Sequence, residues 1–155
     1  MKYFVRFTIF SCMIFIMFSC QPESVHQSSY HFKHDTWNSF EKAGFRFMVE
    51  NTRGEYDLYL NIVYTNQYPR EYITFATQMI TPGGEERLRN FHLRLRTKDE
   101  VYTAYENVEV FTEKILLIKD YTFEKKGNCI IRLDNRMSKV ETAGVRRIEL
   151  EVIRH

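Results

Sequence analysis

The sequence predicts an all-β fold: a single antiparallel β-sandwich domain that follows a lipoprotein signal peptide and a short tether. Apolar and polar residues alternate with a period of two in several runs from Tyr30 on, which is typical of half-buried strands. Turn residues separate these runs, and 13 Phe and 10 Tyr residues supply aromatic side chains that pack well in sheets. Short strands with turns between them, in a chain of single-domain length, favour a sandwich.

The first 19 residues have the layout of a secretory signal. Lys2 and Arg6 form a positive start, and residues 7–19 are uncharged and mostly apolar. This run is too short to cross a bilayer as a helix, which takes about 20 residues. We therefore expect residues 1–19 to be a signal peptide that is removed from the mature protein.

Cys20 stands where lipidation is expected. Met17 lies three positions before it and Ser19 directly before it, and this pattern resembles the lipobox of bacterial lipoproteins, although Phe18 departs from the usual small or aliphatic residue. Cys20 is thus predicted to carry a diacylglyceryl group, usually joined by an N-acyl chain. Two or more acyl chains give stable membrane anchoring without a transmembrane helix.

Residues 20–29 are predicted to be a lipidated tether, with the sandwich domain over 30–155. The segment 21–29 is polar, contains Pro22, and is expected to be disordered. Some surface-displayed lipoproteins carry an acidic cluster directly after the cysteine, whereas this tether has one acidic residue, Glu23. The periplasmic face of the outer membrane is therefore favoured over the cell surface.

The strands are expected in chain order. Residues 55–64 give the clearest alternation, with Tyr56, Leu58 and Leu60 on one face and polar residues between them. The turns TPGG and EKKGN fall between later runs. The stretches 84–90 and 98–107 lack a sustained apolar period, so short turns are favoured there over helices. The predicted strands cover residues 45–50, 55–64, 72–80, 90–96, 114–123, 128–133 and 146–153.

Charge and cysteine content narrow the functional classes. The chain has 22 basic and 20 acidic residues, and loss of the signal peptide removes two basic residues, which balances the charges. Bulk charge therefore gives no reason to expect nucleic-acid binding. Cys129 lies in a strand-like run and is interpreted as a small buried hydrophobic residue rather than a reactive thiol.

Catalytic and metal-binding signatures are missing from the sequence. It contains no G-x-S-x-G, HExxH, P-loop or CxxC motif. His31, His34 and Asp35 are close in sequence, but near a strand the positions i and i+3 point to opposite faces, so a metal site is disfavoured. We nominate no catalytic residue, metal ligand or cofactor.

Exposed aromatic and basic residues are the remaining candidates for a ligand or partner surface. Tyrosines over strands can form a platform that stacks sugars, or cover the rims of a sandwich with the ring buried and the hydroxyl wet. The tyrosines considered for a platform are Tyr59, Tyr64, Tyr68, Tyr72, Tyr102 and Tyr105. Five basic residues form either a solvated strand face, which is the commoner arrangement, or a stripe for lipid headgroups or an acidic partner: Arg87, Arg89, Arg94, Arg96 and Lys98. The candidate surface residues are Trp37, Tyr59, Tyr68, Tyr72, Arg94 and Arg96.

Three stretches carry a family resemblance. They are Trp37 followed by FRFMVEN, the run YDLYLNIVYTNQYPREYITF, and KGNCIIRLDNRM before VETAGVRRIELEV. Together they resemble the GldH family of gliding-motility lipoproteins over most of residues 20–153. The sequence departs from the family pattern in lacking an asparagine shortly after Tyr68-Pro69, and RLRNFHLRLRTKDE lacks the family's glycine and tryptophan.

The resemblance implies a non-enzymatic lipoprotein of the cell envelope. Such proteins are needed for gliding and are associated with the envelope machinery that also underlies type IX secretion. Only Cys20 carries over as a functional residue. We therefore expect a domain anchored to the outer membrane that acts by contact with other envelope proteins. The alternative is a glycan-binding surface lipoprotein that uses exposed tyrosines, and an enzyme ranks third.

Overall fold

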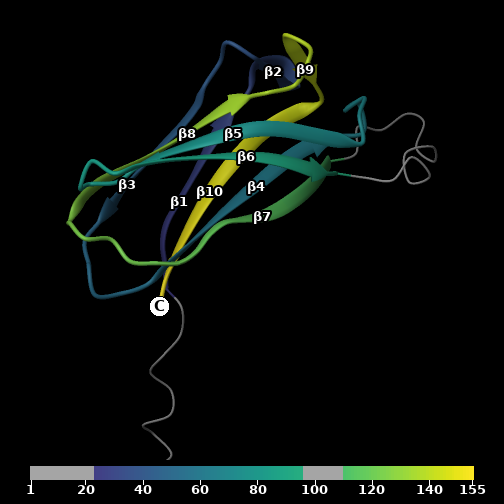
Figure 1. Ribbon diagram of the computed structural model, residues 1–155. Helices are drawn as coiled ribbons and strands as arrows, with labels where there is room; N and C mark the ends of the chain where they lie inside the picture. The colour runs from purple at the N-terminus through teal and green to yellow at the C-terminus, as the bar shows by residue number, and fades with distance from the viewer. Residues whose placement is uncertain (1–22, 96–109) are drawn as a thin grey trace, which may run out of the picture.

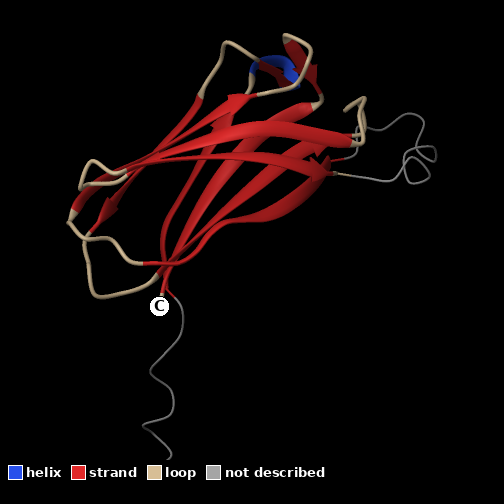
Figure 2. Cartoon of the chain, viewed as in Figure 1, coloured by secondary structure: helices blue, strands red, loops and turns tan. Residues whose placement is uncertain are grey.

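The computed structural model describes residues 23–95 and 110–155, and over these residues the chain forms two antiparallel sheets packed face to face (Figures 1 and 2). The predicted β-sandwich is confirmed. Cys20, Arg96, Tyr102 and Tyr105, together with the stretch 98–107, lie outside the described residues. No helix in the described parts of the chain is long and apolar enough to cross a membrane.

Each large sheet has four strands among the described residues. The first sheet has the order β1 (Glu23–His31), β10 (Val145–Arg154), β4 (Tyr56–Thr65) and β7 (Val110–Tyr121). The second sheet has the order β3 (Ala43–Val49), β8 (Gly127–Asn135), β5 (Tyr72–Ile80) and β6 (Glu86–Arg94). A small third pair joins β2 (Thr36–Asn38) to β9 (Glu141–Ala143), after the short 3-10 turn η2 (Lys33–Asp35).

The core lies between the inner faces of the two large sheets. On β4 the predicted alternation holds, and Leu58, Leu60 and Ile62 are fully buried. Phe75 of β5 and Ile131 of β8 face them from the second sheet and are also buried. Since burial of one such side chain stabilises by roughly 1.5–3 kcal/mol, the alternation of apolar residues accounts for the pairing of the sheets.

The strand directions define two ends of the sandwich. The start of β1, the end of β10 and the connections 50–55, 81–85 and 122–126 lie at one end, which we call the Glu23 end (Figure 1). The β2–β9 pair lies at the opposite end, which we call the Trp37 end.

Two sequence-based expectations about segment structure are wrong. The described part of the predicted tether, from Glu23 on, is strand β1, which pairs with β10 from Glu23–Arg154 to His31–Arg147. Polar residues persist there because β1 is an edge strand with only partly buried side chains, and backbone pairing holds it in place. Residues 86–94 form strand β6, where a short turn was expected over 84–90.

Candidate partner-binding face

The outer face of the second sheet has an unusual composition for a solvated surface. Its outward-facing strand positions carry three arginines (Arg46, Arg94 and Arg132), two acidic residues (Glu86 and Asp134) and no lysine. Large apolar side chains are exposed there: Met48 at 54% and Leu88 at 72%. Protein interfaces are enriched in arginine, methionine and aromatic residues and depleted in lysine, so this face has the composition of an interface.

The sheet register brings apolar and basic residues together on this face. Arg46 of β3 is opposite Ile130 of β8, which is opposite Ile80 of β5. In the next row, Arg132 of β8 is opposite Gln78, and Gln78 is opposite Leu88 of β6. Directly opposed residues in antiparallel strands share a face. The first row ends at Glu86 of β6, which is opposite Ile80 and accepts a hydrogen bond from Gln78. The two rows therefore form a band across all four strands, made of Arg46, Ile130, Ile80 and Glu86 in one row and Gly44, Arg132, Gln78 and Leu88 in the next.

Two cations in this band lack an acidic partner. In the described parts of the chain, the Arg46 side chain makes no hydrogen bond or ion pair, and the Arg132 side chain only donates from Nη1 to Oε1 of Gln78 at 3.4 Å. The third arginine, Arg94, is ion-paired with Glu71. Arg46 and Arg132 are thus available for carboxylates from another molecule.

The face is open along its edge strand β3. Gly44 is opposite Arg132, and a Cβ added at Gly44 would meet no atom within 4 Å. Four strands about 4.8 Å apart, three of them about 30 Å long and β3 about 24 Å long, give a flat area on the order of 550 Å². One partner in a standard interface contributes roughly 800 Å², so this face supplies most of one partner's share.

Tyr72 and His92 lie toward the Trp37 end of the same face. Their rings stack with centroids 4.8 Å apart and an interplanar angle of 5°, and His92 Nδ1 is 2.8 Å from the hydroxyl of Thr74. A depression of about 510 Å³ beside them is also lined by Arg136 and Met137. The predicted residues Tyr72 and Arg94, which are opposite each other in the register, therefore do lie together.

The outer face of the first sheet differs because its charges are paired with each other. Lys114 Nζ is 2.7 Å from Glu151 Oε2 and 4.4 Å from the centre of the Tyr59 ring. Arg147 Nε is 2.6 Å from Glu149 Oε1. Burial, followed by the charge of a nearby aspartate, raises the pKa of the Tyr59 phenol. The groups on this face are already satisfied within the chain.

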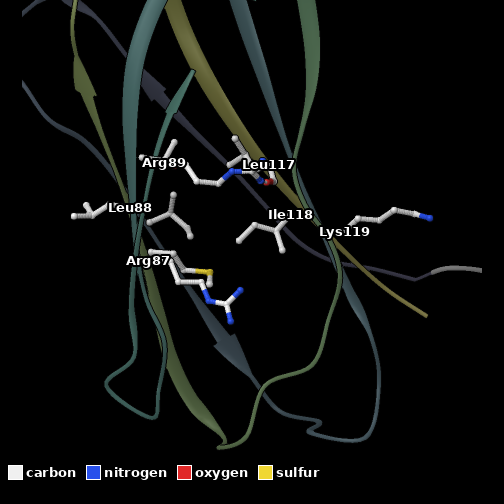
Figure 3. Close-up of a pocket in the computed structure, with 9 residues that line it drawn as sticks. Arg87, Leu88, Arg89, Leu117, Ile118 and Lys119 are labelled. Atoms are coloured by element: carbon white, nitrogen blue, oxygen red, sulfur yellow. The ribbon is translucent and has the colours of Figure 1, made fainter. Parts of the chain in front are cut away.

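A groove of about 480 Å³ runs between the edge strands β6 and β7 (Figure 3). Arg89 of β6 reaches across it and donates from Nη1 to the carbonyl oxygen of Leu117 of β7, at 2.6 Å. Arg87 lies over the Tyr121 ring at 4.7 Å, and its Nε is 2.7 Å from Oε1 of Glu85. Charged side chains on one edge strand, as on β6, and a bulged register at another, as on β7, are common protections against unwanted strand pairing. We therefore assign the groove a structural role.

The remaining predicted surface residues do not join this face. Trp37 is fully buried, and its indole Nε1 donates to the carbonyl oxygen of Glu41 at 3.0 Å. Its prediction as a surface residue is wrong, because the β2–β9 pair holds the ring inside the Trp37 end of the core. Tyr68 is buried at 7% exposure, with its hydroxyl donating to the carbonyl oxygen of Tyr72. Tyr59 lies on the other sheet.

The tyrosines do not form a sugar-stacking platform in the described structure. Tyr64 and Tyr68 are buried, Tyr59 is on the first sheet, and Tyr72 is on the second. Across residues 23–95 and 110–155, no three histidine, cysteine or acidic residues are grouped to hold a metal ion. Cys129 is fully buried, as expected, and burial raises the pKa of its thiol to about 12.

The residues that sequence reasoning missed are Arg46, Arg132, Met48, Leu88 and Gly44. Each residue lies at an outward-facing position of its strand, and its neighbours in space come from other parts of the chain. The alternation in FRFMVE places Arg46 and Met48 on the face of the strand away from the buried phenylalanines, so their outward position could have been predicted from the sequence. Their proximity to Arg132 and Leu88 depends on the strand order β3-β8-β5-β6, which no local pattern specifies.

Comparison with known proteins identifies the family. A family model described as GldH lipoprotein matches residues 24–152. A search of curated proteins gives no match. Among solved structures, dimeric latent PorU from Porphyromonas gingivalis aligns with 87% of this chain and 14% of its own chain, at 11% identity and a TM-score of 0.41. This chain thus spans a small part of PorU, and so distant a likeness carries no functional argument. From the family match, the chain belongs to the GldH lipoprotein family, a gliding-motility family whose members are anchored to a membrane of the cell envelope.

Proposed function

We propose that the protein is a non-enzymatic lipoprotein, anchored through Cys20 to the periplasmic face of the outer membrane. It acts by binding a protein of the gliding-motility and type IX secretion machinery through the outer face of the second sheet. The observation that carries the choice of face is the pair of unpartnered arginines, Arg46 and Arg132, beside exposed Met48 and Leu88. The partner surface is expected to be apolar at its centre and to carry carboxylates opposite the arginines.

Anchoring strengthens such an interface without adding contacts. A lipid confines the domain to a plane, so a second membrane-associated protein meets it at a high effective concentration. An interface that is weak in solution therefore suffices in the envelope. This reasoning applies to any partner held at the same membrane.

The test is cross-linking in intact cells, followed by identification of the captured proteins by mass spectrometry. The double variant Arg46→Glu/Arg132→Glu should lose the partner, because each reversed charge removes a charge-assisted hydrogen bond, and loss of each bond lowers affinity by about tenfold or more. Gly44→Tyr should also block binding, because it places a bulky ring on the open face beside Arg132, while leaving the fold intact. The matched control is Lys139→Glu, which reverses an exposed charge in the connection after β8.

Three results decide the proposal. Loss of motility or secretion partners from both face variants, at normal protein abundance and membrane fraction, supports it. Unchanged capture by both variants refutes the choice of face. Capture of glycan-uptake porins and their lipoproteins in place of motility proteins refutes the proposed machinery.

A further inference from the structure

The folded domain begins very close to the predicted lipid attachment site. Strand β1 starts at Glu23, three residues after Cys20. Three residues span at most about 10–11 Å when fully extended. If Cys20 carries the lipid, as our proposed function requires, the domain therefore has no long tether and must stay beside the bilayer.

The start of β1 is fixed to the rest of the domain. Glu23 is opposite Arg154 at the end of β10, and the two side chains form an ion pair. From there β1 pairs with β10 along its length to His31, with one bulge. An anchor attached to Glu23 therefore holds the entire sandwich by its Glu23 end, since β10 lies inside the first sheet.

We propose that the Glu23 end of the sandwich rests against the lipid headgroups of the membrane that holds Cys20. The lipid-facing surface consists of the connections 50–55, 81–85 and 122–126 with the end of β10, all of which lie at this end (Figure 1). The β2–β9 pair then points away from the membrane. Its distance from the bilayer is about 34 Å, the length of the ten-residue strand β4.

The composition of these connections suits headgroups rather than hydrocarbon. None of the large apolar side chains that are exposed in the described residues belongs to the three connections. Lys125 and Lys126 are exposed at the β7–β8 connection, and Arg53 at the β3–β4 connection. Four exposed acidic residues, Glu50, Glu55, Glu85 and Glu124, lie in the same three connections. This mixture of charges provides donors for lipid phosphates without strong attraction to anionic lipid, so the acyl anchor, and not charge, brings this end to the membrane.

The native cysteines leave the protein open to selective labelling. Cys12 leaves with the signal peptide, Cys20 is blocked by its lipid, and Cys129 is fully buried with a thiol pKa of about 12. A cysteine introduced at an exposed lysine is therefore the reactive site in the mature protein. Lys125→Cys reports on the Glu23 end, and Lys139→Cys, in the connection from β8 to β9, reports on the opposite end.

The experiment uses the full lipidated chain, purified from membranes and reconstituted into phosphatidylethanolamine–phosphatidylglycerol vesicles that contain a headgroup-nitroxide lipid. A fluorophore on Lys125→Cys should be quenched several-fold more than one on Lys139→Cys. Insertion of 20 Gly/Ser residues between Pro22 and Glu23 adds a flexible tether of roughly 25 Å and should abolish this difference.

The outcomes separate this inference from the proposed function. Stronger quenching at position 125, lost on insertion of the linker, supports the orientation. Equal quenching at both positions, or stronger quenching at position 139, refutes the orientation while leaving the lipid anchor in place. Mass spectrometry of the purified chain decides the anchor itself: a Cys20 without lipid overturns both proposals.

Discussion

Gly144 provides the sharpest test of the packing described above. It precedes β10 with a φ of +83°, in the left-handed region that favours glycine. A Cβ at this position would lie 2.4 Å from the backbone nitrogen of Tyr68 and 2.6 Å from its Cα. Backbone atoms cannot rotate away as a side chain tip can. Gly144→Ala must therefore displace the connection that contains Tyr68.

That connection resists displacement. The Tyr68 N–H donates to the Thr65 carbonyl oxygen at 3.0 Å, and its hydroxyl donates to the Tyr72 carbonyl oxygen at 2.9 Å. An L-residue in the left-handed region costs roughly 1–2 kcal/mol, and overpacking costs roughly 1–3 kcal/mol. Gly144→Ala is thus expected to lower the free energy of unfolding by about 2–5 kcal/mol, a large share of the 5–15 kcal/mol typical of a domain.

Gly44→Ala is the matched control with the opposite expected sign. Gly44 lies within strand β3, and no atom stands within 4 Å of an added Cβ. Alanine in a strand is favoured over glycine by roughly 0.5–1 kcal/mol. The assay is urea unfolding of the unlipidated mature chain, followed by fluorescence of Trp37, which is the one tryptophan and is fully buried. With an m-value of about 2 kcal/mol/M, the Gly144→Ala midpoint should fall by about 1–2.5 M. A midpoint at or above the wild-type value would show that the Tyr68 connection yields, and the packing argument would then be wrong.

Three further predictions concern single side chains. Burial alone would raise the pKa of the Asp57 carboxyl, but the hydrogen bond from the Asp120 N–H and other contacts hold it below the ordinary 3.8. The stability that the ionised carboxylate contributes is therefore present above pH 3.8 and lost as the pH falls through the folded-state pKa. Asp57→Asn should flatten the acid side of a plot of urea midpoint against pH. Cys129, whose thiol pKa is raised to about 12 by burial, should stay unreactive toward a thiol reagent at pH 8 and react only as urea unfolds the chain; reaction in the native state would contradict its burial. Arg89→Ala removes the hydrogen bond to Leu117 and should destabilise the domain by about 1 kcal/mol, with faster amide exchange concentrated in β6; unchanged exchange would show that Arg89 does not hold β6 to β7.

Local alternation predicted most of the fold. Where one face of a strand is fully buried, as in Tyr56–Thr65, burial itself imposes the period of two, and the strand is readable from its own residues. Strand β1 was not readable in this way. In ESVHQSSYH the side chains are at most partly buried, so the strand depends on backbone pairing with β10, more than a hundred residues away in sequence. Backbone pairing at that separation leaves little trace in side-chain pattern.

The candidate site shows the same limit. Trp37 was a reasonable surface candidate as the chain's one tryptophan, but burial of its ring depends on β2 and β9 meeting at one end of the sandwich. Tyr72 and Arg94 were nominated separately, and the register alone places them opposite each other. The unpartnered state of Arg46 and Arg132 is a property of what surrounds them in space. Sequence supplied the residue types, and topology decided which of them share a surface.

The two proposals constrain each other. If the Glu23 end rests on the membrane, the strands of the second sheet run away from the bilayer, and the band with Arg46 and Arg132 faces sideways along the membrane plane. A partner must then present its carboxylates within about 34 Å of the bilayer, the length of strand β4. The 20-residue linker described above relaxes that requirement without touching the face. It should therefore weaken partner capture in cells while leaving binding by the soluble domain unchanged. Equal loss in both settings would mean that the linker damages the fold, and equal retention would mean that the height of the face above the membrane has no role.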